Sequence, residues 1–296
     1  MQLTNFIIKS MLSRSISGKK IYLPILVALS VALFSCSSEE KNNTPVGENE
    51  QPAAETKKDM PKAEIDPIVM EKDGITLTEL ASSPKFAQAT LKLEEKPMSN
   101  DEGATHFSFG VSNYELAVQT KDAEGKCCAN SDKGQHIHLI LNNAPYTAHY
   151  EKAFDRELEN DYYVGLAFLS RSYHESIKNG SAHKVFDFVI GPDEGYEKAD
   201  LSQPMLFYSR PKGEYKPADC DQVLLDFFVN NAKISPADYT VRATINGTEF
   251  VIEKWVPFVM EGLPRGENTV KIELLDKEGN VVPGDFGTVE RLSLIH

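Results

Sequence analysis

Cysteine is scarce in this sequence: four occur among 296 residues, at positions 36, 127, 128 and 220. So few cysteines exclude a disulfide-rich scaffold, whose small core needs several bridges. Basic residues are also in deficit, because 31 Lys and Arg stand against 44 Asp and Glu, which gives a net charge of −13. Such a chain is a poor electrostatic match for nucleic acid. We therefore expect no nucleic-acid partner.

Recognisable catalytic motifs are missing as well. The chain has no HExxH, no G-x-S-x-G, no glycine-rich phosphate loop and no EF-hand pattern. Vicinal cysteines followed by histidines could form a Cys/His nucleophile, but no third orienting group lies at a recognisable spacing. The sequence therefore favours a binding protein over an enzyme.

Residues 1–35 are predicted to be a lipoprotein signal peptide. Lys19 and Lys20 precede the apolar run "IYLPILVALSVALF", which is too short for a comfortable membrane span and fits a secretory signal. The following "LFSC" resembles the bacterial lipobox, and this implies cleavage before Cys36 and lipidation of its sulfur. Lipidated Cys36 would anchor the protein to a membrane. Ordinary cleavage, with Cys36 present by chance, is the alternative.

Residues 36–73 are predicted to form a flexible acidic tether. The segment is polar and proline-containing and shows no apolar periodicity, so it cannot bury enough surface to offset its ordering entropy. The "SSEE" directly after Cys36 resembles the acidic export signal of Bacteroidetes surface lipoproteins. This resemblance implies a lipid-anchored protein of the bacterial outer membrane, exposed at the surface or facing the periplasm.

The rest of the chain contains a weak internal repeat. "FSFGVSNYEL" (107–116) aligns with "LDFFVNNAKI" (225–234), and "HIHLILNNAPYTAHYEKAF" (136–154) aligns without gaps with "TVRATINGTEFVIEKWVPF" (240–258). Further matches join 164–169 to 270–275 and 184–190 to 288–294. Each block alternates apolar and polar residues, which predicts a strand, and Asn-Gly at 246–247 predicts a hairpin turn.

Short strands at regular spacing, without a long amphipathic helix, indicate antiparallel sandwiches. We expect an all-β chain of two tandem immunoglobulin-like β-sandwiches at 74–192 and 203–296, joined by a linker at 193–202. The first sandwich is the candidate for a ligand site, and the second is expected to act as a scaffold.

Four blocks resemble a family of uncharacterised Bacteroidetes lipoproteins: "GQHIHLILNNAPYTAHYE", "GLAFLSRSYHES", "PMLFYSRPKGEY" and "VRATINGTEF" with the segment that follows it. The resemblance covers 105–296. Some members of that family carry the automatic name phosphopeptide-binding protein, although no forkhead-associated motif is present here. The family implies no known activity.

The repeat serves as an internal control for candidate functional residues. Nineteen residues separate Leu116 from His136, whereas five separate the matching Ile234 from Thr240. The first copy therefore carries an insertion, which includes "DAEGKCCANSDKG". It also carries histidines where the second copy has Thr240, Arg242, Glu253 and Asn280. These histidines are not required by the architecture, so they are candidates for an added function.

The candidate function is binding of copper or zinc. His136 and His138 occupy positions i and i+2 of a strand and should project from one face. His174 follows a strand that should neighbour theirs. Imidazole and thiolate are suitable ligands for Cu and Zn, so the predicted metal-binding set combines these groups. Its members are His136, His138, His174, Cys127 and Cys128, and His149 is a further candidate.

Other interpretations of these residues stay open. Same-face histidines on a strand are often merely solvated polar positions. Cys127 or Cys128 could instead form a disulfide with Cys220 and join the two sandwiches. Arg171, Arg210 and Lys212 lie in aromatic, loop-like settings, and Arg is suited to phosphate or carboxylate. They define an alternative function, the recognition of an extracellular or periplasmic protein or (phospho)peptide, although pairing with local acids would also explain these basic residues.

Overall fold

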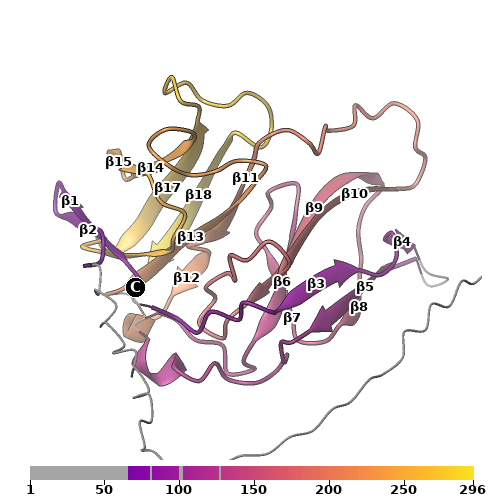
Figure 1. Ribbon diagram of the computed structural model, residues 1–296, viewed down its shortest axis with the longest axis horizontal. Helices are drawn as coiled ribbons and strands as arrows, with labels where there is room; N and C mark the ends of the chain where they lie inside the picture. The colour runs from indigo at the N-terminus through magenta and orange to yellow at the C-terminus, as the bar shows by residue number, and fades with distance from the viewer. Residues whose placement is uncertain (1–65, 81, 100–102, 127, 220) are drawn as a thin grey trace, which may run out of the picture. The chain divides into compact units, whose positions relative to one another are not determined.

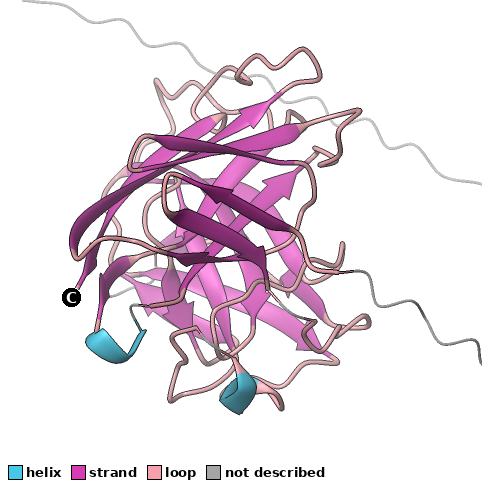
Figure 2. Cartoon of the chain, turned by 90° about the vertical axis from the view of Figure 1, so that its left-hand side faces the viewer, coloured by secondary structure: helices cyan, strands magenta, loops and turns pink. Residues whose placement is uncertain are grey.

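The computed structural model describes residues 66–80, 82–99, 103–126, 128–219 and 221–296. The predicted signal peptide, Cys36 and most of the predicted tether lie outside these residues, as do Cys127 and Cys220. Regular structure in the described part consists of β-strands and two short 3₁₀ helices, at Ala123–Gly125 and Pro217–Asp219 (Figure 2). None of the helices in these ranges has the length and apolar character needed to cross a membrane.

The first sandwich consists of two facing sheets with the order β3-β5-β4 and β10-β9-β6-β7; strand β8 pairs with β5 (Figure 1). Their alternating apolar residues meet in one core, formed by Phe107 and Phe109 of β5 with side chains of β3, β6, β9 and β10. The strands are β3 (Thr90–Leu93), β4 (Met98–Ser99), β5 (Thr105–Ser112), β6 (His136–Leu141), β7 (Thr147–His149), β8 (Ala153–Arg156), β9 (Asp161–Ser170) and β10 (His183–Ile190).

The second sandwich has the sheets β1-β2-β16-β13-β11 and β12-β18-β17-β14-β15. Its pairings are antiparallel except for β12 with β18, which is parallel. Leu225, Phe227 and Val229 of β13 face Val241, Ala243 and Ile245 of β14 across the core. The strands are β1 (Val69–Lys72), β2 (Ile75–Glu79), β11 (Met205–Arg210), β12 (Gly213–Tyr215), β13 (Val223–Asn230), β14 (Thr240–Ile245), β15 (Thr248–Ile252), β16 (Phe258–Glu261), β17 (Gly266–Leu275) and β18 (Thr288–Ile295).

The internal repeat is present in the strand pairing. Strands β5 to β10 correspond in order to β13 to β18. In the first copy the pairs are β5–β8, β6–β7, β6–β9 and β9–β10, and the second copy has the equivalent pairs β13–β16, β14–β15, β14–β17 and β17–β18. The hairpin asparagines also match, since Asn142 and Asn246 both have positive φ, of 47° and 49°. The predicted all-β fold of two immunoglobulin-like sandwiches is confirmed.

The N-terminal hairpin differs from the expected domain boundary at residue 74. Strand β2 pairs with β16, so residues 69–79 belong to a sheet of the second sandwich. Ile75 and Leu77 are buried in the core of that sandwich, which explains why the hairpin binds there. The sequence shows the alternation of a strand but not which sheet edge the strand joins.

The sheet of β6 and β9 has two buried faces. Ile137, Leu139 and Leu141 point into the core of the first sandwich. Ile140 lies on the opposite face and packs, with residues of β9, against Met205, Phe207 and Phe228 of the second sandwich. Side chains alternate along a strand, so His136 and His138 share the face of Ile140. Both histidines are therefore directed toward the second sandwich.

Candidate metal centre

The first two candidate ligands come from the start of β6. His136 pairs with Ser170 of β9 and His138 with Phe168, and both imidazoles are fully buried. His174 comes from the turn just after β9, where its N–H donates to the carbonyl of Arg171 at 2.9 Å. Its φ of 68° lies in the left-handed region, which is uncommon for a residue other than glycine and costs on the order of 1 kcal/mol or more. This turn directs His174 back toward β6.

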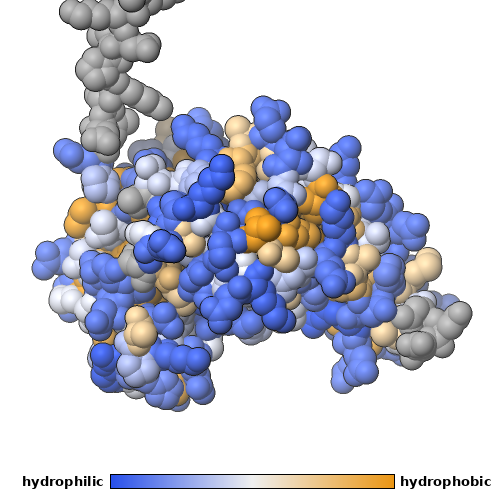
Figure 3. All heavy atoms as spheres, turned by 90° about the horizontal axis from the view of Figure 1, so that it is seen from below, coloured by the Kyte–Doolittle hydropathy of each residue, from blue (hydrophilic) through white to orange (hydrophobic). Residues whose placement is uncertain are grey.

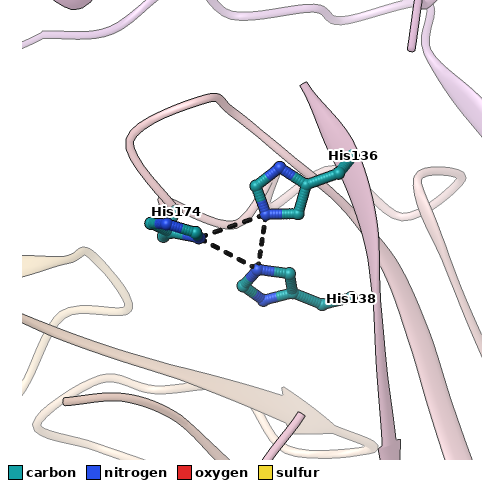
Figure 4. Close-up of side chains that lie close together, drawn as sticks. All are labelled: His136, His138 and His174. Atoms are coloured by element: carbon teal, nitrogen blue, oxygen red, sulfur yellow. Dashed lines mark hydrogen bonds between the residues drawn. The ribbon is translucent and has the colours of Figure 1, made fainter. Parts of the chain in front are cut away.

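The three imidazoles converge, so that one ring nitrogen of each lies close to a ring nitrogen of the other two (Figure 4). His136 Nε2 lies 2.8 Å from His138 Nε2 and 3.1 Å from His174 Nδ1, and the last two atoms are 3.4 Å apart. A point about 1.8 Å from all three nitrogens lies in their plane, and moving it out by about 1 Å gives the bonds of about 2.0–2.1 Å that zinc makes to histidine. The triangle thus has the dimensions of one face of a tetrahedral metal site.

The backbone around Gly134 orients the first imidazole. His136 Nδ1 lies 2.8 Å from the Gly134 carbonyl, and because a carbonyl oxygen accepts, Nδ1 carries the proton. His136 Nε2 is then unprotonated and presents its lone pair to the other two rings. Gly134 has a φ of +84°, and a Cβ there would lie 2.4 Å from the backbone of Val118. Only glycine fits this position without a shift of the chain.

The environment keeps the imidazoles neutral. The pKa of His136 is lowered to about 4, chiefly by burial; the Gly134 hydrogen bond opposes this shift, and the nearby Arg210 charge contributes to it. Burial, with lesser contributions from neighbouring imidazoles and Arg210, also holds the pKa values of His138 and His174 well below the usual range. Neutral imidazole is the form that binds zinc and copper.

Tyr146 closes one side of the cluster. Its ring stacks on His138 with centroids 3.6 Å apart and planes 12° apart, and its hydroxyl lies 3.4 Å from His174 Nδ1. Two cations of the second sandwich lie against the same ring: Lys212 Nζ is 4.2 Å from the centroid and Arg210 Cζ is 5.5 Å. Lys212 also donates to the Tyr146 carbonyl at 2.7 Å. Burial raises the pKa of Tyr146, so the phenol is protonated at neutral pH.

The remaining metal candidates lie elsewhere. Among the described residues, the cluster of potential ligands contains the three histidines and no thiol. Cys128 is buried in a separate apolar cluster with Leu80, Tyr173, Leu224 and Val259. His149 stacks on Phe154 at 3.3 Å and contacts Thr147 instead. Cys127 lies outside the described residues, as does Cys220, so the predicted disulfide stays a prediction.

Two of the three basic residues of the alternative function, Arg210 and Lys212, lie against the same ring, that of Tyr146. Arg171 is 5% exposed, is ion-paired with Glu175 at 3.1 Å and donates to the carbonyls of Ser176 and Pro84. The expected pairing of Arg171 with a local acid is thus present. Arg210 is 8% exposed and donates to the Tyr215 hydroxyl rather than to an acid. Both guanidinium groups are buried, whereas Lys212 is half-buried.

Sequence reasoning missed Tyr146 and Gly134. The repeat contained a signal for Tyr146, because its counterpart is Phe250, a buried core residue of the second copy. The hydroxyl is therefore a difference between the copies, as the histidines are. Gly134 falls in the insertion, which has no counterpart, and the sequence offered no comparable signal for it.

Comparison with known proteins adds little to this picture. No protein-family model matches the chain, and no curated protein matches it either. Among solved structures, the fibronectin(III)-like modules of Clostridium thermocellum CbhA match at 9% identity and a TM-score of 0.25, over 70% of this chain and 94% of that one. The Bacteroides ovatus mixed-linkage glucan utilization protein SGBP-B, in complex with a heptasaccharide, matches at 10% identity and a TM-score of 0.19, over 79% and 71%.

Proposed function

We propose that this protein is a non-enzymatic binding module that holds a transition-metal ion, copper or zinc, through His136, His138 and His174. The observation that supports the proposal is the convergence of three buried ring nitrogens within 3.4 Å of one another. Three neutral nitrogen ligands with room for a fourth group form a common set for these ions.

Hydrogen bonding alone does not account for the arrangement. Each inward nitrogen either carries a proton or presents a lone pair. In a triangle of three such atoms, every assignment leaves at least one contact between two atoms of the same kind. Buried polar groups in that situation cost about 1–3 kcal/mol. One metal ion accepts all three lone pairs at once, and the strained φ of His174 is the type of outlier that accompanies functional sites.

Calorimetric titration of the full chain with Zn²⁺ and with Cu²⁺ tests the proposal. The expected result is uptake of one ion per chain, which is lost when His136, His138 and His174 are all replaced by alanine. The matched control is the double variant His106→Ala with His183→Ala, because these histidines lie outside the cluster. Absence of uptake by the unaltered chain, or equal loss in the control, would contradict the proposal.

We also propose that Cys36 anchors the protein by lipid to the bacterial outer membrane. The lipobox-like "LFSC" and the "SSEE" behind it support this localisation. Cell fractionation tests it: the unaltered chain should sediment with outer membranes, and Cys36→Ala should not. Protease treatment of intact cells then separates a surface-exposed protein, which is degraded, from a periplasm-facing one.

A further inference from the structure

Arg210 is a buried cation without an anionic partner in the described part of the chain. Its Nη1 donates to the Tyr215 hydroxyl at 3.1 Å, and its Nε has no hydrogen-bond partner. The cross-strand neighbour Asp226 is fully buried but ion-paired with Lys178 instead. An uncompensated buried charge is costly, so a negative group formed beside Arg210 would be strongly favoured.

Tyr146 is a group in position to supply that charge beside the histidine cluster. Its ring lies between the histidine cluster and the cations, with Arg210 and Lys212 against the ring and its hydroxyl 3.4 Å from His174 Nδ1. In a tetrahedral centre with bonds of about 2.05 Å, neighbouring ligand atoms are about 3.3 Å apart. The Tyr146 oxygen thus lies at a ligand-to-ligand distance from one of the three nitrogens.

The charge balance of a loaded centre points the same way. Three neutral imidazoles leave the full charge of a divalent ion facing Arg210 and Lys212, in a buried setting where repulsion is poorly screened. A phenolate ligand would reduce the charge of that centre by one and place its negative oxygen near Arg210. Metal binding commonly releases ligand protons, and here the proton of the phenol would pass to solvent.

We propose that Tyr146 is the fourth ligand of the centre, bound as phenolate, and that Arg210 of the second sandwich is its counter-ion. This rests on the proposed function of the three histidines and assigns the oxidation state as well. A phenolate with three imidazoles suits Cu(II), a harder ion than Cu(I). Without the phenolate, the same cluster beside two cations would favour a monovalent ion such as Cu(I).

Visible absorption of the full chain loaded with Cu(II) tests this assignment. A phenolate bound to Cu(II) gives an intense charge-transfer band, which we expect in the unaltered chain and expect to be lost in Tyr146→Phe. The matched control is Tyr150→Phe. The centroid of the Tyr150 ring lies 5.2 Å from that of the His136 ring, but the Tyr150 hydroxyl forms a hydrogen bond with the Ser131 hydroxyl. Tyr146→Phe should also weaken Cu(II) binding about 10-fold or more and leave binding of Ag(I), a Cu(I) analogue, nearly unchanged.

Resonance Raman spectra of the unaltered chain keep the test independent of folding in the variants. Excitation in the band should enhance tyrosinate ring modes, and Arg210→Gln should shift the band and weaken Cu(II) binding. Cu(II) uptake without a band, or a band that persists in Tyr146→Phe, overturns the assignment of Tyr146 but leaves the histidine site intact. Tighter binding of Ag(I) than Cu(II), unaffected by Tyr146→Phe, also overturns it. Absence of all metal uptake refutes both proposals.

Discussion

Acidification should destabilise the metal-free protein through its buried imidazoles. The pKa of His136 is lowered from 6.5 to about 4 in the folded state, chiefly by burial. The unfolded chain therefore binds more protons than the folded chain between these values, so stability is retained above pH 6.5 and falls as the pH drops toward 4. For His136 alone, the linkage relation gives a loss of about 2.5 kcal/mol between pH 7.5 and pH 4.5.

The assay is urea denaturation at those two pH values with a chelator present. His136→Asn should have a smaller pH dependence than the unaltered chain by roughly the same 2.5 kcal/mol. The control is His106→Asn, whose side chain is 45% exposed and pairs with Asp155 at the surface. If His136→Asn and the unaltered chain lost equal stability on acidification, burial of a neutral imidazole at this position would be refuted.

Three further predictions follow from local contacts. Gly134→Ala should bring a Cβ to 2.4 Å from the Val118 backbone, displace the carbonyl that orients His136 and weaken Zn²⁺ binding by about 10-fold or more in calorimetry. Leu77→Ala should cost about 2–5 kcal/mol in urea denaturation, because this N-terminal side chain is fully buried in the second sandwich. Asp226→Ala should cost about 3–5 kcal/mol by the same measurement, since it leaves Lys178 without its buried partner. A loss of stability below about 1 kcal/mol in Leu77→Ala or in Asp226→Ala would contradict the packing described.

Much of the fold was predictable because its signals are local. Alternation of apolar residues defined the strands, and asparagine turns such as Asn246–Gly247 defined the hairpins. The alignment of matching blocks in the two copies then predicted equivalent strands in the same order. Strand periodicity also placed His136 and His138 on one face, and the neighbouring strand brought His174 beside them.

Other features depend on contacts between distant residues and left little trace in the sequence. The face of β6 that carries the histidines is buried only because the second sandwich covers it, so periodicity alone could not distinguish a solvated pair from a buried one. Arg210, on β11 of the second sandwich, likewise lies against a ring of the first sandwich, that of Tyr146. The pairing of β2 with β16 joins residues about 180 positions apart, and no local pattern specifies that partner.

One face of the molecule is covered mainly by hydrophilic residues. The face shown in Figure 3 is largely hydrophilic, with hydrophobic residues in small groups among charged and polar ones. His136 and His138, which have no counterpart in the second sandwich, are buried instead, on the face of β6 that packs against that sandwich.

The position of the β1–β2 hairpin has a mechanical consequence. The second sandwich is assembled from residues 69–79 and 205–295, so the first sandwich is an insertion whose entry and exit are both fixed to the same partner. Two attachment points restrict rotation in a way that a single linker does not. The two attachment points thus hold the histidines of the first sandwich in place relative to Arg210 and Lys212 of the second. Tension applied at the N-terminal side acts first on the second sandwich, which carries these two cations.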